Sequence, residues 1–502
     1  MNIILYVLDS LRADHVSAYG YERETTPVLD GLAQDGVLFE NCIAPGTWTR
    51  PVASSILSGV YPSVHGTYVS NDAYQPPTTS LPILLNEAGY ETVAVVSGNM
   101  HSRAGFADGF DDYIDHIGRD VIPQAENTGV AGTRGHEINR EFIGWLDDRD
   151  RDDPFFAMLW STGTHYPYAP PKGYRDYLDP TYDGPVDGTP ECLSYIISED
   201  DRQQLIGYYD GEIRYNDHCI GQLCDSLRDR DEYENTLIIT IGDHGDGFGE
   251  HPGFYGHGSM PPYEALVHVP CIVRTPTDVD HERVDEQVSL VDLYPTFIDL
   301  AYDGDCEDFF REQTQGTSFA PAVYGNAIDR SDPVFGSAKN EERALMYRMV
   351  RSNERKHISV TPLAEDPEVR KYGNVVGDEA TEGPNGTIAE LLHLPRTLLL
   401  KFQQWDSRML WQIARHPGYY LRVYNRIYRK HDGFLFDLVN DPTEQINLRL
   451  DRPHEFARWH ESLVAFTEES HELRDELGTR TADFEMGDDL KERLAQLGYR
   501  EY

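Results

Sequence analysis

The sequence lacks an uninterrupted apolar run of about 18 residues, the length that a membrane-spanning helix needs. It also lacks a basic stretch ahead of its first apolar segment, residues 2–8, so we expect no signal peptide. Cysteine is scarce, and the six cysteines form neither a Cys-x-x-Cys pair nor a framework spacing, which disfavours a zinc ribbon or a disulfide scaffold. We expect reduced, mostly buried thiols and a cytoplasmic protein.

Basic residues are few, since 43 Lys and Arg stand against 86 Asp and Glu, and the formal net charge is -43. A surface of this sign repels polyanions, so nucleic acid is excluded as a general partner. Charge repulsion of this size is tolerated best where salt screens it. The composition therefore predicts a halophilic source, and it concerns solubility and habitat rather than mechanism.

The chain of 502 residues is long enough for a large α/β domain and a smaller one. Residues 2–8 form a nearly continuous apolar run that ends at Asp9, which is typical of a central parallel strand. Residues 235–241 repeat this pattern and lead into Asp243 and His244. Other strands are expected at 37–43, 91–96 and 155–160, alternating with helices at 26–35, 80–88, 137–146, 200–227 and 290–301. The alternation predicts a large, mostly parallel central sheet flanked by helices.

Two loop segments, 302–317 and 325–332, indicate a boundary between domains. We assign residues 1–332 to a catalytic domain and residues 333–502 to a smaller C-terminal α+β subdomain. The subdomain contains a predicted helical insertion at about 386–430.

The stretch 46–59 presents a hydroxyl at the start of a short helix. Pro51 suits the first helical position and Gly59 suits the C-terminal cap, which places Thr49 just ahead of the helix N-terminus. The dipole and unpaired N–H groups there favour negative charge. Taken alone, a threonine in this place is more often a cap than a nucleophile.

Four side chains are predicted to converge at the carboxyl end of one sheet, where open α/β folds bind ligands. They are Asp9, Thr49, Asp243 and His244, which supply hard oxygens and one imidazole. Each acid by itself is more often a solvated or capping residue. Together, the four predict a divalent-metal site with an internal nucleophile, because a bound metal lowers the pKa of a hydroxyl and offsets charge on a phosphorus or sulfur centre.

Ten motifs follow one another in order along the chain. They are Leu8 to Gly20, Ser58 to Gly66, Leu84 to Tyr90, Thr164 to Pro167, Gly242 to Asp246, Gly249 to His251, Pro262 to Glu264 with Val269 and Pro270, Asp292 to Thr296, Phe436 to Leu438, and Asp441 to Leu448. In content and order they resemble the sulfatase family of the alkaline phosphatase superfamily, over nearly the whole length. The resemblance implies an alkaline-phosphatase-like sandwich.

The resemblance also implies roles for single residues. It implies one divalent metal ion at Asp9, Asp243 and His244, with Thr49 as the nucleophile beside it. It places His165 and His257 on the oxyanion or leaving-group side, where His165 fits a proton donor to the leaving oxygen. For His257, a surface loop residue is an equally good interpretation. The predicted substrate contacts are Arg50, Asn99 and His251.

The chain departs from the family pattern at residues that take part in the sulfatase reaction or bind its metal ion. Sulfatases carry a Cys or Ser that is oxidised to formylglycine and an Arg four residues later, whereas this chain has Thr49 and Ala53. Threonine cannot be converted to the aldehyde, so no formylglycine is expected. Ser10 stands in place of a second acid, and Ser97, Gly98 and Asn99 occupy the segment where a Lys is usual. The reduced carboxylate set weakens the case for calcium and leaves Mg²⁺, Mn²⁺ and Zn²⁺ open.

Three functions remain open at this point. The first is a metal-dependent hydrolase of sulfate or phosphate esters that uses covalent attack by Thr49 on an anionic ester of a glycan, lipid or small molecule. The second is a phosphoglycol or phosphoethanolamine-type transferase that acts on membrane lipid or lipid-linked glycan. The third is a catalytically silent relative that binds an anionic glycan or a partner protein.

The insertion differs in charge from the rest of the chain. Residues 391–430 hold eight basic residues, one acid and seven aromatic residues. Such a segment can lie on an anionic membrane surface, which would put the protein at the inner membrane face. The alternative, which we favour, is a helical hairpin that packs on its own acidic main domain.

Membrane contact through 391–430 predicts that the protein co-sediments with anionic vesicles and that reversing the charge at Arg422, Arg426 and Arg429 weakens this binding. The physical reason is that each basic residue near such a surface contributes about 1 kcal/mol. Co-sedimentation that is insensitive to the charge reversal would count against membrane contact.

Overall fold

The computed structural model spans the chain and describes residues 1–115, 135–149, 153–189, 192, 196, 198–251, 254–276, 282–302, 313–328, 330, 332–372, 433–479 and 482–483. The predicted insertion at about 386–430 therefore lies outside the described residues. Within them, no helix is both long and apolar enough to cross a membrane.

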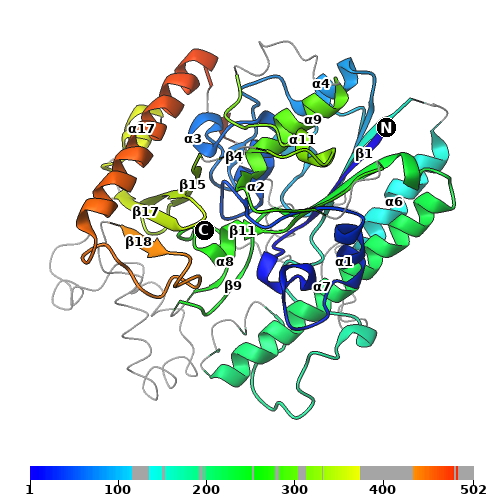
Figure 1. The fold of residues 1–502 in the computed structure, drawn as a ribbon, viewed down its shortest axis with the longest axis horizontal. Helices are drawn as coiled ribbons and strands as arrows, with labels where there is room; N and C mark the ends of the chain where they lie inside the picture. The colour runs from blue at the N-terminus through cyan, green and yellow to red at the C-terminus, as the bar shows by residue number, and fades with distance from the viewer. Residues whose placement is uncertain are drawn as a thin grey trace.

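An eight-stranded sheet forms the centre of the molecule (Figure 1), in the order β13-β2-β12-β8-β1-β7-β5-β6. Its pairs are parallel except that β12 runs antiparallel to both neighbours. The strands are β1 Asn2–Leu8, β2 Gly36–Phe39, β5 Glu91–Val96, β6 Asp112–Asp115, β7 Phe155–Ser161, β8 Thr236–Gly242, β12 Cys271–Arg274 and β13 Glu282–Val284. The predicted mostly parallel central sheet is confirmed.

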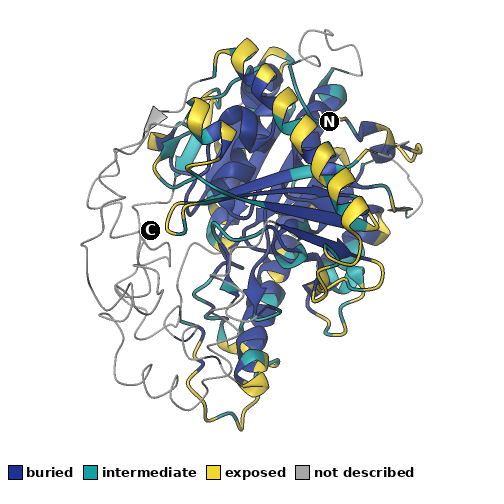
Figure 2. Cartoon of the chain, turned by 90° about the vertical axis from the view of Figure 1, so that its left-hand side faces the viewer, coloured by how far each residue is buried: buried dark blue, intermediate teal, exposed yellow. Residues whose placement is uncertain are grey.

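Strand β1 lies inside the sheet and every one of its residues is buried; Figure 2 shows the strands of the central sheet mainly in the buried colour. Because side chains alternate along a strand, Ile3 and Leu5 enter one hydrophobic core while Ile4 and Leu8 enter the other. Burial on both faces explains why the run 2–8 contains almost no polar residue.

Helices cover both faces of the sheet (Figure 1). One core contains residues of α1, α6 and α7, and the other contains residues of α2, α4 and α9. The long helix α7 begins with a capping box, in which Ser198 Oγ accepts from Asp201 N at 3.0 Å. The helices are α1 Pro27–Gln34, α2 Thr49–Ser58, α3 Pro62–His65, α4 Leu81–Glu87, α6 Gly135–Asp148, α7 Glu199–Arg228, α8 Glu264–Val267, α9 Leu293–Ala301, α11 Ala320–Val323, α12 Pro367–Tyr372 and α17 Pro453–Leu477.

Two expectations were wrong in detail. The single strand predicted over 37–43 is divided at Glu40 and Asn41: β2 joins the central sheet, and β3 (Cys42–Ile43) pairs with β11 (His268–Val269) and β14 (Val288–Ser289). Helix α2 begins at Thr49 itself, after the extended residue Trp48. The predicted C-terminal cap is confirmed, because Gly59 has φ 71.

A second, antiparallel sheet of order β15-β16-β17-β18 lies apart from the first. Its strands are β15 Val334–Asn340, β16 Leu345–Arg351, β17 Arg355–Pro362 and β18 Phe434–Asp437. Helix α17 runs along this sheet (Figure 1). The expected smaller C-terminal sheet is confirmed, and the division of the chain at residue 332 stays our proposal.

A chain of buried polar contacts joins the start of α2 to this second sheet. Trp48 Nε1 donates to the Tyr68 carbonyl at 2.9 Å, and Tyr68 Oη donates to Glu368 Oε2 at 3.0 Å. Glu368 in turn accepts from Arg348 at 2.9 Å and from Arg474 at 3.2 Å. Separating buried charges from their partners is strongly unfavourable, so these contacts fix the two parts of the molecule against each other.

His65, at the end of α3, is buried as a neutral ring. Thr67 N donates to its Nδ1 at 3.0 Å, so the ring proton lies on Nε2, which is 3.1 Å from Ser55 Oγ. Burial, together with the charge of Arg474, lowers the pKa of His65 to about 3. Protonation at Nδ1 would place two N–H groups against each other.

We predict that this histidine makes the free energy of unfolding fall with acid. Between its unfolded pKa near 6.5 and its folded pKa of about 3, the unfolded chain binds the extra proton, so stability rises with pH in that window. Urea melts of the wild type should lose about 2 kcal/mol from this group between pH 8 and pH 5.

The variant His65→Gln should show a correspondingly shallower pH dependence. Substitution of the exposed His454 by Gln is the matched control and should leave the pH dependence as in the wild type. An equal slope in His65→Gln and wild type would contradict the assignment.

Candidate active site

Four neighbouring parallel strands end at one edge of the central sheet, and each is followed by a candidate site residue. In spatial order β5, β7, β1 and β8 lead to Asn99, His165, Asp9 and Asp243. Because the strands are parallel, their carboxyl ends share this edge, which is where open α/β sheets bind ligands. Helix α2 carries Thr49 to the same place, since the Thr49 hydroxyl contacts Asp9.

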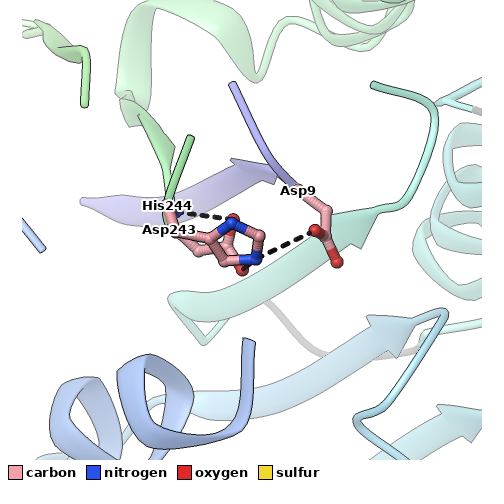
Figure 3. Close-up of side chains that lie close together, drawn as sticks. All are labelled: Asp9, Asp243 and His244. Carbon is pink, nitrogen blue, oxygen red and sulfur yellow. Dashed lines mark hydrogen bonds and ion pairs between the residues drawn. The ribbon is translucent and has the colours of Figure 1, made fainter. Parts of the chain in front are cut away.

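Asp9, Asp243 and His244 form a compact buried cluster (Figure 3). His244 Nε2 lies 3.4 Å from Asp9 Oδ1 and 3.5 Å from Asp243 Oδ2. One ligand atom from each residue lies within 4.8 Å of the other two, and all three side chains are fully buried. The structure thus brings together the three predicted metal ligands.

The surroundings of Asp243 and His244 fit a cation. Asp243 Oδ1 accepts from Ser10 N at 2.9 Å and from His244 N at 2.8 Å, whereas Asp243 Oδ2 and His244 Nε2 have no hydrogen-bond partner among the described residues. Burial and the charge of Asp9 raise the pKa of Asp243 well above its usual range. His244 Nδ1 donates to the Gly245 carbonyl at 2.9 Å, which leaves the lone pair on Nε2, as a metal ligand requires.

Thr49 is the first residue of α2 and is fully buried. Its Oγ1 donates to Asp9 Oδ2 at 3.3 Å. The hydroxyl therefore lies between a helix N-terminus, which favours negative charge, and the carboxylate of Asp9. This geometry is compatible with a nucleophile, and the role itself stays a prediction.

His165 and His257 lie against each other, with ring centroids 4.5 Å apart, and His257 is 4.6 Å from the ring of His244. His165 Nδ1 donates to the Tyr166 carbonyl, and His257 Nδ1 donates to Asp246 Oδ1 at 3.1 Å. Burial lowers the pKa of both rings. The neutral rings carry their lone pairs on Nε2, so His165 must take up a proton before it can donate one.

The three predicted substrate contacts occupy different surroundings. The guanidinium of Arg50 binds protein groups, including the carbonyls of Asn99 at 3.3 Å and Asp72 at 3.1 Å. Asn99 is buried beyond β5. His251 packs on Tyr263, with ring centroids 3.8 Å apart. Their roles in substrate binding stay predictions.

Two residues were missed in the sequence. His101 accepts from Arg50 Nη2 at 2.8 Å through its Nε2, and burial lowers its pKa to about 3. Asp246 orients His257 and also accepts from Tyr168 Oη. Both follow strands that lead into the site, so position alone was a usable signal for each.

Comparison with known proteins shows which family model and which characterised relatives the chain matches. Residues 1–303 match the family model described as Sulfatase. An arylsulfatase of Clostridium perfringens is 28% identical over 367 residues, covering 60% of this chain and 75% of that protein. An N-acetylglucosamine-6-O-sulfatase of Bacteroides thetaiotaomicron is 22% identical over 382 residues, covering 60% and 67%.

Solved structures share the fold over almost the whole length. A phosphonate monoester hydrolase of Agrobacterium radiobacter has a TM-score of 0.63 at 18% identity, with 95% of this chain and 96% of that chain covered. A protein in complex with its substrate D-glucosamine-2-N,6-O-disulfate has a TM-score of 0.65 at 18% identity, covering 95% and 98%. The alkaline-phosphatase-like fold predicted from the sequence is thereby confirmed.

We predict that Asp243→Asn separates metal affinity from folding. Burial raises the pKa of Asp243, which means that the charged carboxylate is unfavourable in the folded protein without a metal. The neutral amide removes this cost, so the metal-free variant should be more stable than the wild type by about 1 to 2 kcal/mol. Its affinity for Mn²⁺ should fall at least about a hundredfold. Thermal melts with and without Mn²⁺, together with calorimetric titration, measure both effects.

The exposed Asp225, changed to Asn, is the matched control and should keep the Mn²⁺-dependent rise in Tm. If Asp243→Asn binds Mn²⁺ as tightly as the wild type, the metal site lies elsewhere.

Proposed function

This chain belongs to the sulfatase family, and on that premise we propose that Thr49 is the nucleophile with which it cleaves sulfate or phosphate esters. Family membership makes it a hydrolase of sulfuric or phosphoric esters. The observation that carries the proposal is the Thr49 hydroxyl at 3.3 Å from Asp9 Oδ2, at the first residue of a helix. A nucleophile needs a neighbouring group that orients it and an environment that tolerates its charge, and Asp9 and the helix N-terminus supply these.

Asp9, Asp243 and His244 are the proposed metal ligands. When bound, a divalent ion would supply a lowered pKa for the neighbouring hydroxyl and positive charge opposite the non-bridging oxygens of the ester. The donor set of two carboxylates and one imidazole suits Mg²⁺, Mn²⁺, Ca²⁺ or Zn²⁺.

In the proposed first step, Thr49 Oγ forms a bond to sulfur or phosphorus, and the bond from that atom to the ester oxygen breaks. The electron pair leaves with the ester oxygen. The Thr49 proton passes to Asp9 Oδ2, which accepts its hydrogen bond at 3.3 Å, and His165, protonated on Nε2, gives a proton to the leaving oxygen on the opposite side. His257, held by Asp246 at 3.1 Å, lines the same side of the site.

In the second step, water attacks the ester formed on Thr49 and gives its proton to the same imidazole. The bond to Thr49 Oγ breaks, the acid product leaves, and Thr49 recovers a proton. Formylglycine enzymes avoid this second displacement, which phosphoryl groups undergo readily. The threonine therefore favours a phosphoryl or phosphonyl ester over a sulfate, and the name of the phosphonate monoester hydrolase of similar fold agrees with that preference.

The substrate class, the location and the habitat are proposals as well. We propose an anionic ester of a glycan, lipid or small molecule as the substrate, a cytoplasmic location, and a saline habitat consistent with the net charge of -43. The transferase alternative depends on residues 391–430.

Replacing Thr49 by Ala should lower turnover of aryl sulfate, aryl phosphate and phosphodiester substrates at least about a thousandfold, because no other hydroxyl replaces the nucleophile. The Mn²⁺-dependent rise in Tm should persist, since the three ligands remain.

Thr181→Ala, on an exposed loop, is the matched control and should retain full activity. Unchanged turnover in Thr49→Ala would refute covalent attack by this residue.

A further inference from the structure

Asn99 presents a buried amide that the protein itself does not use. The residue is 1% exposed, and neither Nδ2 nor Oδ1 has a hydrogen-bond partner among the described residues. An unpaired buried amide costs about 1 to 3 kcal/mol when no ligand satisfies it. Asn99 follows β5, the strand next to β7, at the edge of the sheet where His165, Asp9 and Asp243 are gathered.

Arg50 fixes the backbone that carries this amide. Its Nε donates to the Asn99 carbonyl at 3.3 Å and its Nη2 to His101 Nε2 at 2.8 Å. Its Nη1 donates to the carbonyls of Ser70 and Asp72. Arg50 is fully buried and follows Thr49 directly, so one guanidinium ties the Asn99 segment to the nucleophile helix.

Arg50 brings one fixed positive charge to the Asn99 segment, and the lysines, Arg12 and Arg103 add none that is buried and available. Of the four lysines in the described residues, Lys172 is exposed and the others form ion pairs with Glu341, Glu264, Glu444 and Asp475. Arg12 pairs with Asp14 and Glu250. Arg103 is exposed, where solvent and salt screen its charge.

We propose that Asn99 determines charge specificity: its neutral amide makes the site select esters with one negative charge, such as diesters, over phosphate monoesters with two. This rests on the proposed function. Asp9 and Asp243 bring two negative charges to the site, which one divalent ion would offset, and Arg50 beside Thr49 offsets one charge of the ester. A dianionic ester would bury a second negative charge without a partner, which is unfavourable in a site of low polarity.

The test compares methyl 4-nitrophenyl phosphate, a monoanion, with 4-nitrophenyl phosphate, a dianion at pH 8. Both release the same leaving group from phosphorus. The wild type should show the higher kcat/KM for the monoanion, and Asn99→Lys should lower the monoanion-to-dianion ratio at least about tenfold. If only 4-nitrophenyl sulfate is turned over, the two phosphates are compared as competitive inhibitors of that reaction.

Two further variants keep the test decisive. Asn99→Asp has nearly the same shape as the wild type, so it can be measured even if the lysine variant does not fold. It should raise the monoanion-to-dianion ratio, because the added negative charge lowers kcat/KM for the dianion more than for the monoanion. Asn353→Lys adds the same charge at an exposed turn and should leave the ratio unchanged.

The outcomes separate the two proposals. Activity in the wild type with a ratio at or below one, or a ratio that neither Asn99 variant changes, overturns the specificity role and leaves the proposed hydrolase intact. Absence of turnover on every sulfate and phosphate ester overturns the hydrolase, and the specificity role with it.

Discussion

The repulsion between two buried carboxylates is the constraint on which the rest of the site depends. Asp9 and Asp243 are both fully buried, within reach of one imidazole nitrogen. Two such groups persist in a folded protein only where donors or a cation offset their charge. The backbone N–H of Ser10, in a left-handed conformation at φ 67, is one of these donors. His244 directs Nε2 toward both carboxylates, at 3.4 Å from Asp9 Oδ1 and 3.5 Å from Asp243 Oδ2.

The parallel sheet explains why so many polar and titratable side chains gather at one edge of it. Each strand is apolar over its length because helices cover both faces, so polar side chains are confined to the loops beyond the carboxyl ends. Four adjacent strands deliver four such loops to one edge. The same arrangement leaves the histidines packed ring against ring, and each ring is oriented through Nδ1 by a carbonyl or a carboxylate.

Much of the central sheet and of the Asp9, Asp243 and His244 cluster was predictable from local sequence patterns. An apolar run that ends in an acid identified β1 with Asp9 and β8 with Asp243, because a buried parallel strand is apolar over its length and places the next polar residue at its carboxyl end. The division between β2 and β3 was not predictable, since it depends on pairing with strands more than two hundred residues away along the chain. The contacts of Arg50 were equally hidden, because its carbonyl partners lie far from it along the chain and leave no local pattern in the sequence.

The polar contacts from Trp48 through Tyr68 to Glu368 bear on how such a protein can evolve. They make the antiparallel sheet a structural support of helix α2, which begins at Thr49. Recombination that exchanged this half of the gene between relatives would have to transfer matching partners for Tyr68 together with it. Substrate range in this lineage is therefore expected to diversify through loops and insertions, while the two sheets are inherited as one unit.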